Sequence, residues 1–459
     1  MDSGMLADLV EAVIADGGID SVMVVRNGYA VLDTVVYPIP EDTGHIIHSC
    51  TKSITATLIG IAIDRGLLAG VDVPVVEILA DAAPATVDEL KASMTVEDLL
   101  TMSTGLDCRD SYLYDWQGMA EMQASPNWTA HVLGLPMADE PGTRFEYCNG
   151  SSLLLSAILT EVTGKSASDF ATEVLFEPLG ITDVTWPASP EGVTIGWGEM
   201  ILRPGDMAKF GYLYLRDGEW DGEQVVPRNW TVTATTTQIH AGTLSDGYGY
   251  QWWIDDTGYV MAQGFGGQYI IVIPDQDLVV VYTSALAGEA MSTPQILTKE
   301  YVLAAVSPET RLRPDPVDEA RLAAAVARAR SGPEPYVPVM PDMVTDVDEV
   351  RYDFRDNDVG TKWFVIRFED DSAVFSSADA DGITELEIGL DGRFVSSATL
   401  PVAVRGQWRD DSTFAIEYRV IGQVERGTIE FTFEDDIATV TTRESVGGAT
   451  ETIIADRVP

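Results

Sequence analysis

In the first half of the chain, some segments show the apolar pattern of β-strands and others show apolar residues at helical spacing. Residues 21–26 and 28–36 are largely apolar runs around an Asn27-Gly28 pair, a pattern typical of a β-hairpin. From residue 51 to residue 65 the apolar side chains recur at helical spacing, and Gly66 follows where such a helix would end. Helices are also predicted around 95–102, 151–163 and 167–176.

After Gly247 the pattern changes to a series of short strands, predicted at 248–254, 259–263, 268–273 and 278–283. The segments between them, such as Pro274 to Asp277, consist of residues that favour turns. A sheet built from an early hairpin and a late meander, with helices between them, predicts an α+β or three-layer α/β fold.

The pattern changes again towards the end of the chain. Residues 306–344 are rich in proline at both ends and enclose one expected helix near 317–330, so we interpret them as a linker. Residues 345–459 show alternation of period two and Asp-Gly turns, which predict a small all-β barrel or sandwich. The predicted organisation is therefore a domain at 1–305, a linker at 306–344 and a β domain at 345–459.

The chain is strongly acidic. Its 459 residues include 28 Lys+Arg and 73 Asp+Glu, for a formal net charge of −45 at pH 7. Such a surface repels phosphate backbones, so we expect no nucleic-acid partner. Salt adaptation, in which ions screen this self-repulsion, and simple solvation of an acidic protein both remain open.

The cysteines and the first residues of the chain give information on the cellular compartment. Cys50, Cys108 and Cys148 are compatible with one bridge and a free thiol, or with three free thiols. The first residues lack the basic and apolar regions of a signal peptide, and no apolar stretch is long enough for a membrane span. We therefore expect a soluble protein whose compartment stays unknown: cytoplasmic as the sequence stands, or periplasmic or secreted if a leader was removed. The oligomeric state stays open.

Ser49 and Lys52 form a Ser-x-x-Lys pattern at the start of the first predicted internal helix. Side chains at i and i+3 lie on one face, which places an amine beside a hydroxyl. Desolvation lowers the pKa of such a lysine, so that it can accept the serine proton, and the N–H groups of the helix start can stabilise an oxyanion. A serine at a helix start is also a common N-cap, so this pattern alone leaves both interpretations open.

A second pattern, Tyr147-Cys148-Asn149, precedes the helix predicted at 151–163. With both patterns in this order, the chain resembles the serine β-lactamase and penicillin-binding-protein superfamily, in its class C-like branch. That branch includes class C β-lactamases, D-alanyl-D-alanine peptidases, family VIII carboxylesterases and 6-aminohexanoate-dimer hydrolases. Supporting stretches that also resemble the family lie at 99–106, 141–145, 175–180 and 206–211.

The resemblance implies a three-layer α/β/α fold with an antiparallel sheet and a helical subdomain. It also implies that Ser49 forms an acyl-enzyme, that Lys52 and Tyr147 share the proton transfers, and that Asn149 contacts the substrate or fixes Lys52. A phenol beside an ammonium is expected to have a lowered pKa. A tyrosine packed in the core and an N-capping asparagine are the alternatives.

The third family motif differs in this sequence. Where β-lactamases carry Lys-Thr-Gly, this chain has Gly264, Phe265, Gly266, Gly267 and Gln268. The resemblance implies that the N–H of Gln268 is the second oxyanion donor. The cation that would hold a substrate carboxylate is missing, so a neutral or apolar substrate is expected. A simple hairpin loop is the alternative for these glycines.

Together these features predict a serine hydrolase that acts on a small-molecule ester or amide, with no cofactor. The four histidines show no metal-ligand spacing, so we expect no metal. One alternative is a β-lactamase or D-amino-acid peptidase. Another, of a different class, is a non-catalytic binding protein on a hydrolase fold. The role of the β domain is left open.

Overall fold

The computed structural model describes residues 1–110, 116–242, 245–307, 309, 312–357, 359–446, 448 and 450–459. Positions 308, 310 and 311 of the predicted linker and 358, 447 and 449 of the predicted β domain lie outside the described residues, as do 111–115 and 243–244. The helices are α1 Ser3–Asp16, α2 Cys50–Asp64, α3 Val75–Ile78, α4 Glu89–Ser93, α5 Val96–Leu100, α6 Gln117–Gln123, α7 Trp128–Gly134, α8 Asn149–Thr163, α9 Ala167–Ala171, α10 Pro204–Leu215, α11 Arg228–Ala234, α12 Thr293–Leu297, α13 Pro316–Ser331 and α14 Val344–Val347.

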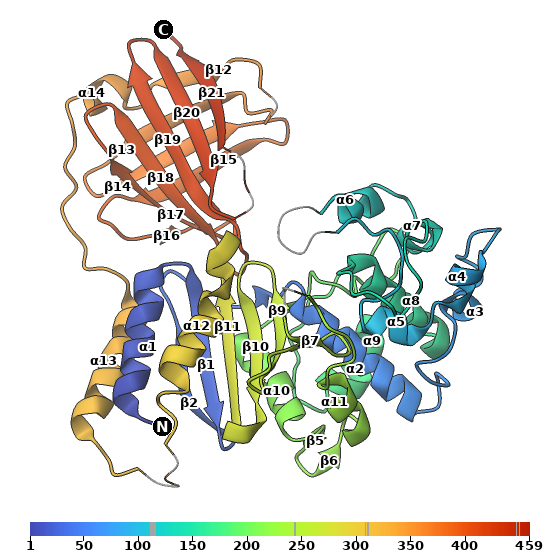
Figure 1. Ribbon diagram of the computed structural model, residues 1–459. Coiled ribbons are helices and arrows are strands. Elements are labelled where there is room, and N and C mark those ends of the chain that lie inside the picture. The colour runs from blue at the N-terminus through green and yellow to red at the C-terminus, as the bar shows by residue number, and fades with distance from the viewer. Residues whose placement is uncertain are drawn as a thin grey trace.

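An antiparallel sheet of seven strands forms the centre of the first part of the chain, in the order β2-β1-β11-β10-β9-β8-β7 (Figure 1). Asn27 and Gly28, with φ of 51° and 78°, close the β1–β2 hairpin where it was predicted. Because β1 pairs with β11, the start of this part and its last strand meet inside one sheet. The strands of this part are β1 Ile19–Arg26, β2 Tyr29–Val35, β3 His45–Ile46, β4 Ile201–Leu202, β5 Glu219–Trp220, β6 Glu223–Gln224, β7 Gly247–Tyr248, β8 Trp253–Ile254, β9 Val260–Gly264, β10 Gln268–Ile273 and β11 Leu278–Ser284.

Helices cover both faces of this sheet and give three layers (Figure 1). On one face α1 packs against β1 and against α13. On the other face α2 packs against β9, and α10 packs against β10 and β11. Beyond α2, helices α5 and α7 both pack against α8 and form a helical region with it. The predicted fold, an antiparallel sheet with a helical subdomain, is confirmed.

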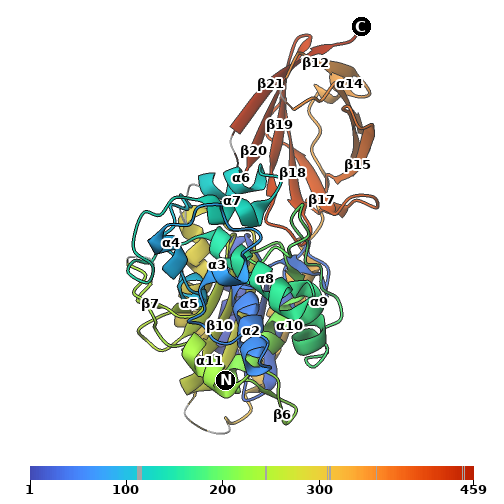
Figure 2. The same ribbon diagram turned by 90° about the vertical axis from the view of Figure 1, so that its right-hand side faces the viewer.

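The second part of the chain is a β-barrel, drawn at the top of both ribbon views (Figure 2). Nine strands in the order β15-β14-β13-β12-β21-β20-β19-β18-β17 form the ring, which a β15–β17 pairing at Gly389 and Arg405 closes. The apolar residues of the alternating pattern, such as Phe414 and Phe431, are buried inside it. Its strands are β12 Arg351–Phe354, β13 Trp363–Phe368, β14 Ser372–Ala378, β15 Ile383–Gly389, β16 Val395–Ser396, β17 Val402–Trp408, β18 Thr413–Val420, β19 Arg426–Glu434, β20 Ile437–Glu444 and β21 Thr450–Arg457.

The barrel contacts the first part through a buried junction. Arg419 of β18 donates to Asp20 of β1 at 2.5 Å, and the His45 ring lies 3.1 Å from the same carboxylate. Nearby, the N–H of Ile46 donates to the carbonyl of Gly422 at 2.8 Å. Because Ile46 lies three residues before Ser49, the barrel is anchored directly beside the predicted nucleophile.

The strand predicted at 248–254 is interrupted, and this part of the prediction was wrong. Strands β7 and β8 occupy its two ends, and Gln251 between them has a φ of 62°. The Gln251 side chain is buried and donates to the carbonyls of Leu99 and Leu100. A tertiary contact therefore overrides the local strand pattern.

Among helices of the described residues, none combines the length and apolar character that crossing a bilayer requires.

Candidate active site

Ser49 stands at the N-terminus of α2, one turn before Lys52. Its backbone is in the right-handed helical region, and its side chain makes no capping hydrogen bond. Instead, Lys52 Nζ lies 2.9 Å from Ser49 Oγ. Ser49 therefore occupies the N-cap position of α2, but its hydroxyl faces an amine and does not cap the helix backbone.

The Lys52 amine is almost fully buried, with 1% of the residue exposed. Besides Ser49 Oγ, it donates to Asn149 Oδ1 and to the carbonyl of Trp197, both at 2.8 Å. Burial lowers the pKa of Lys52 to about 7, although nearby Asp110 raises it. A neutral amine has two N–H groups and one lone pair. When the amine is neutral, its two N–H groups can stay on Asn149 Oδ1 and the Trp197 carbonyl, and its lone pair can then accept from the Ser49 hydroxyl.

Tyr147 lies against both of these residues. Its ring stacks on Trp253 with centroids 5.9 Å apart, and Lys52 Nζ lies 5.0 Å from its ring centroid. Its hydroxyl hydrogen-bonds with Ser49, yet burial raises the pKa of the phenol above its ordinary value of 10.0. The expected lowering of this pKa is therefore wrong, because desolvation disfavours the phenolate more than the neighbouring groups favour it. Tyr147 is a neutral phenol at physiological pH.

Asn149 is the first residue of α8, and it does not serve as the N-cap of that helix. Its backbone N–H and its Nδ2 group both donate to the Asp110 carboxylate, at 3.0 and 3.2 Å. Since Nδ2 faces a carboxylate, Oδ1 must face the other way, towards Lys52. Cys108 and Cys148 form a disulfide that ties the Asp110 segment to this motif. Asp110 could not be predicted from the sequence, because only the pairing of Cys108 with Cys148, which the sequence leaves open, places it beside Asn149.

The third motif forms the β9–β10 hairpin. Phe265 lies edge-on to the His48 ring, with centroids 5.6 Å apart. A Cβ on Gly266 would lie 2.4 Å from Val424 of the barrel, so the glycine allows the barrel to approach. The Gln268 side chain donates to the Ser284 carbonyl at 2.6 Å. Glycines 266 and 267 have φ of 78° and 88°, which suits a hairpin turn.

A cavity of about 550 Å³ opens in front of Ser49. Of the predicted site residues, Ser49, Asn149 and Phe265 line it, whereas Lys52 and Tyr147 are buried beside the serine. Part of the wall comes from the barrel, a contact that no pattern in the sequence indicated. The lining residues are His48, Ser49, Trp116, Met119, Asn149, Trp197, Gly198, Glu199, Phe265, Ala287, Gly288, Met291, Val424, Glu425, Glu444 and Val446.

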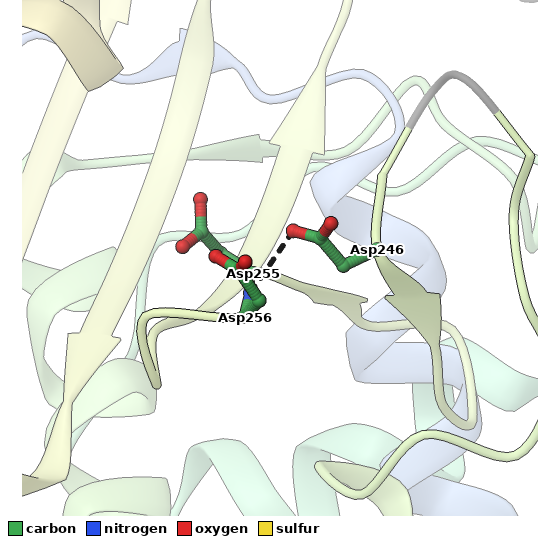
Figure 3. Close-up of side chains that lie close together, drawn as sticks. All are labelled: Asp246, Asp255 and Asp256. Atoms are coloured by element: carbon green, nitrogen blue, oxygen red, sulfur yellow. Dashed lines mark hydrogen bonds between the residues drawn. The ribbon is translucent and has the colours of Figure 1, made fainter.

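One group of carboxylates elsewhere, Asp246, Asp255 and Asp256, comes close enough together to suggest a cation (Figure 3). Asp246 accepts a hydrogen bond from the backbone N–H of Asp256 at 3.0 Å. Asp255 accepts from the N–H of Thr257 at 2.9 Å and pairs with Lys299 at 3.2 Å. These partners already account for the arrangement as a hydrogen-bonded loop, so we assign no metal to it.

Relatives and solved structures resemble this chain at low identity. A 6-aminohexanoate-dimer hydrolase of Paenarthrobacter ureafaciens is 24% identical over 288 residues, covering 58% of this chain and 72% of the relative. The structure of EstCE1, a hydrolase with promiscuous acyltransferase activity, aligns with a TM-score of 0.55 at 17% identity, over 66% of this chain and 99% of that one. An octameric penicillin-binding protein homologue from Pyrococcus abyssi aligns over 99% of this chain and 100% of its own, with a TM-score of 0.50 at 18% identity.

The family model that matches this chain carries the description Beta-lactamase and extends over residues 6–303. Those residues include α2 with Ser49 and Lys52, the Tyr147–Asn149 motif, and the whole seven-stranded sheet. The resemblance proposed from the sequence is confirmed. Because the match covers well over half of the chain, this protein belongs to the beta-lactamase family.

Proposed function

We propose that this protein is a serine hydrolase that cleaves a carboxylic ester or a small amide through an acyl-enzyme on Ser49. One observation carries the proposal: the buried Lys52 amine lies 2.9 Å from Ser49 Oγ, and its other two contacts are fixed acceptors. A lone pair held on a serine hydroxyl is what nucleophilic activation requires. The contact with Ser49 Oγ is not needed to satisfy a structural lysine, because Asn149 Oδ1 and the Trp197 carbonyl already accept from the amine.

Acylation begins when Ser49 transfers its proton to the neutral Lys52 amine and Oγ attacks the carbonyl carbon. The Oγ–C bond forms, and the carbonyl electron pair moves to oxygen. We assign the backbone N–H groups of Ser49 and Gln268 to that oxyanion. When the intermediate collapses, the leaving alcohol or amine receives a proton from the Lys52 ammonium by way of the Tyr147 hydroxyl. Water then releases the acid with the same groups acting in reverse.

The substrate assignment follows from the third motif. Phe265 occupies the place of the family cation and lines the cavity, so a substrate carboxylate finds no positive partner there. Esters and small amides without a carboxylate at this position therefore fit better than β-lactams or terminal D-alanine. The names of two similar proteins, an aminohexanoate-dimer hydrolase and a hydrolase with acyltransferase activity, agree with acyl transfer as the reaction type.

Incubation with p-nitrophenyl acetate and butyrate tests the proposal. We expect turnover by the native protein, an acyl or fluorophosphonate adduct on Ser49 by mass spectrometry, and loss of both in Ser49→Ala. Ser93→Ala removes an exposed hydroxyl elsewhere and serves as the matched control. Turnover that survives in Ser49→Ala would overturn the proposal. Absence of both turnover and labelling would favour a binding protein, and efficient nitrocefin cleavage would favour a β-lactamase.

Asp110 offers a separate prediction, as a positioning residue that acts through Asn149 and Lys52. Asp110→Asn removes the charge that raises the Lys52 pKa, so the rising limb of kcat/KM against pH should move to lower pH. We also expect kcat/KM to fall by about tenfold, because a charge-assisted clamp on Asn149 is lost. Asp107→Asn, three residues earlier, should leave both quantities unchanged. An unshifted pH profile in Asp110→Asn would contradict this role.

A further inference from the structure

The cavity in front of Ser49 is lined by charges of one sign. Glu199, Glu425 and Glu444 line it, and no lysine or arginine does so among the described residues. Among the described residues that line the cavity, His48 is the one with a basic side chain. Burial lowers the pKa of its imidazole to about 3. The wall therefore presents three carboxylates and a neutral imidazole to whatever enters.

These carboxylates are free to meet a ligand. Among described residues, neither Glu199 nor Glu425 nor Glu444 forms an ion pair, although the barrel is otherwise rich in such pairs, for example Arg443 with Glu430. Burial raises the pKa of Glu199, and the nearby charge of Glu425 raises it further, although Lys52 lowers it. Glu199 and Glu425 therefore face one region of the cavity from different parts of the chain.

The rest of the wall is apolar and aromatic. Trp116 and Phe265 stand edge to face, with ring centroids 6.5 Å apart, and Met119 and Met291 lie beside them. Aromatic faces attract ammonium groups as well as alkyl chains. Apolar walls that carry unpaired carboxylates favour a molecule with an apolar body and a cationic end.

We propose that this site selects esters or amides that carry an ammonium group, which the carboxylates of Glu199, Glu425 and Glu444 hold within the Ser49 cavity. The inference rests on the proposed hydrolase function and adds the substrate class to it. Two of the three carboxylates come from the barrel, so the barrel acts as the specificity wall of the catalytic domain. The same field repels anionic substrates, in line with the absence of a cation in the third motif.

Isosteric substrates test the charge alone. On the acyl side, the p-nitrophenyl ester of 4-(trimethylammonio)butanoate is compared with its neutral isostere, the 5,5-dimethylhexanoate ester, and with the anionic hydrogen adipate ester. On the alcohol side, acetylcholine is compared with 3,3-dimethylbutyl acetate. We expect kcat/KM for the cationic member of at least one pair to exceed that of its isostere by about tenfold, as partly exposed ion pairs are individually modest. The adipate ester should be the poorest substrate of the acyl series.

Variants of the barrel carboxylates test whether these residues cause the preference for cationic substrates. In Glu425→Gln and Glu444→Gln the ratio of cationic to neutral kcat/KM should fall by about threefold each, and added salt should reduce it in the native protein. Glu434→Gln, an exposed glutamate of the same barrel outside the cavity, should leave the ratio unchanged. Because the readout is a ratio, a general loss of activity does not affect it.

The possible outcomes separate the two proposals. Hydrolysis of neutral esters with no cationic preference in either pair would overturn the ammonium inference and leave the hydrolase proposal standing. A preference that persists in both barrel variants would overturn the role of the wall. If the protein hydrolyses none of the esters and Ser49 is not labelled, the hydrolase proposal itself is wrong.

Discussion

Replacing Lys52 by methionine is expected to lower kcat/KM for p-nitrophenyl butyrate by about 10³-fold, within the range for loss of a general base. Methionine fills a similar volume without a lone pair, so Ser49 Oγ loses the acceptor 2.9 Å away. Lys52→Met also leaves Asn149 Oδ1 and the Trp197 carbonyl without their donor, so stability should fall by about 1–3 kcal/mol for each unsatisfied acceptor. Steady-state kinetics on the folded variant, checked by circular dichroism, measures the effect.

A second buried lysine supplies the control. Lys91 is 5% exposed, and its Nζ donates to the carbonyls of Leu133 and Leu135 at 2.7 and 2.6 Å. Lys91→Met removes another buried amine, one that does not line the Ser49 cavity. It should lower stability while kcat/KM stays near that of the native protein. An equal loss of activity in both variants would show that Lys52 acts through the fold rather than through Ser49.

The pH profile of the native protein follows from the same amine. Below pH 7 Lys52 is protonated and cannot accept the Ser49 proton, whereas above pH 7 it is neutral. Because burial lowers its pKa to about 7, kcat/KM should rise with pH and reach half of its maximum near pH 7. Tyr147, whose pKa burial raises, would instead give a rise at strongly alkaline pH. A profile with only the alkaline rise would assign the base to Tyr147.

Local patterns predicted the elements that carry the nucleophile. The β1–β2 hairpin follows from the Asn27-Gly28 turn, and α2 and α8 follow from helical spacing of apolar residues, so Ser49 and Asn149 could be placed at helix starts. The residues that orient them could not be predicted in this way. Asp110 reaches Asn149 only because the chain folds back and the Cys108–Cys148 bridge holds it there. Such contacts have no periodic signal in the sequence.

The cavity wall escaped prediction for a related reason. Alternation of period two predicts which residues of the β domain face its interior. It does not predict which part of the other domain the loops at the strand ends contact. Val424 and Glu425 lie in the loop between β18 and β19, and the buried pairing of Arg419 with Asp20 brings that loop to Ser49. The role of the barrel is therefore a property of the domain junction, which sequence patterns within either part do not specify.

This junction is the basis of the second large expected effect. Arg419→Met should lower the free energy of unfolding by about 3–5 kcal/mol, because it leaves the Asp20 carboxylate buried without its cation. Asp20 is 1% exposed and Arg419 has only 9% of its side chain exposed. Esterase activity should fall as well, because the Ile46–Gly422 hydrogen bond beside Ser49 belongs to the same junction. Urea unfolding followed by tryptophan fluorescence measures the first effect.

Arg443→Met provides the comparison within the same barrel. Arg443 pairs with Glu430, but half of its side chain is exposed (49%), so water replaces the lost contact and the cost should be about 0–1 kcal/mol. The double variant Asp20→Asn with Arg419→Met removes both charges and should recover part of the stability lost in Arg419→Met alone. If Arg419→Met costs no more than Arg443→Met, the junction is not held by this ion pair. The barrel would then be kept at Ser49 by other contacts, such as the apolar cluster of Ile46, Val424 and Val446 and the Ile46–Gly422 hydrogen bond.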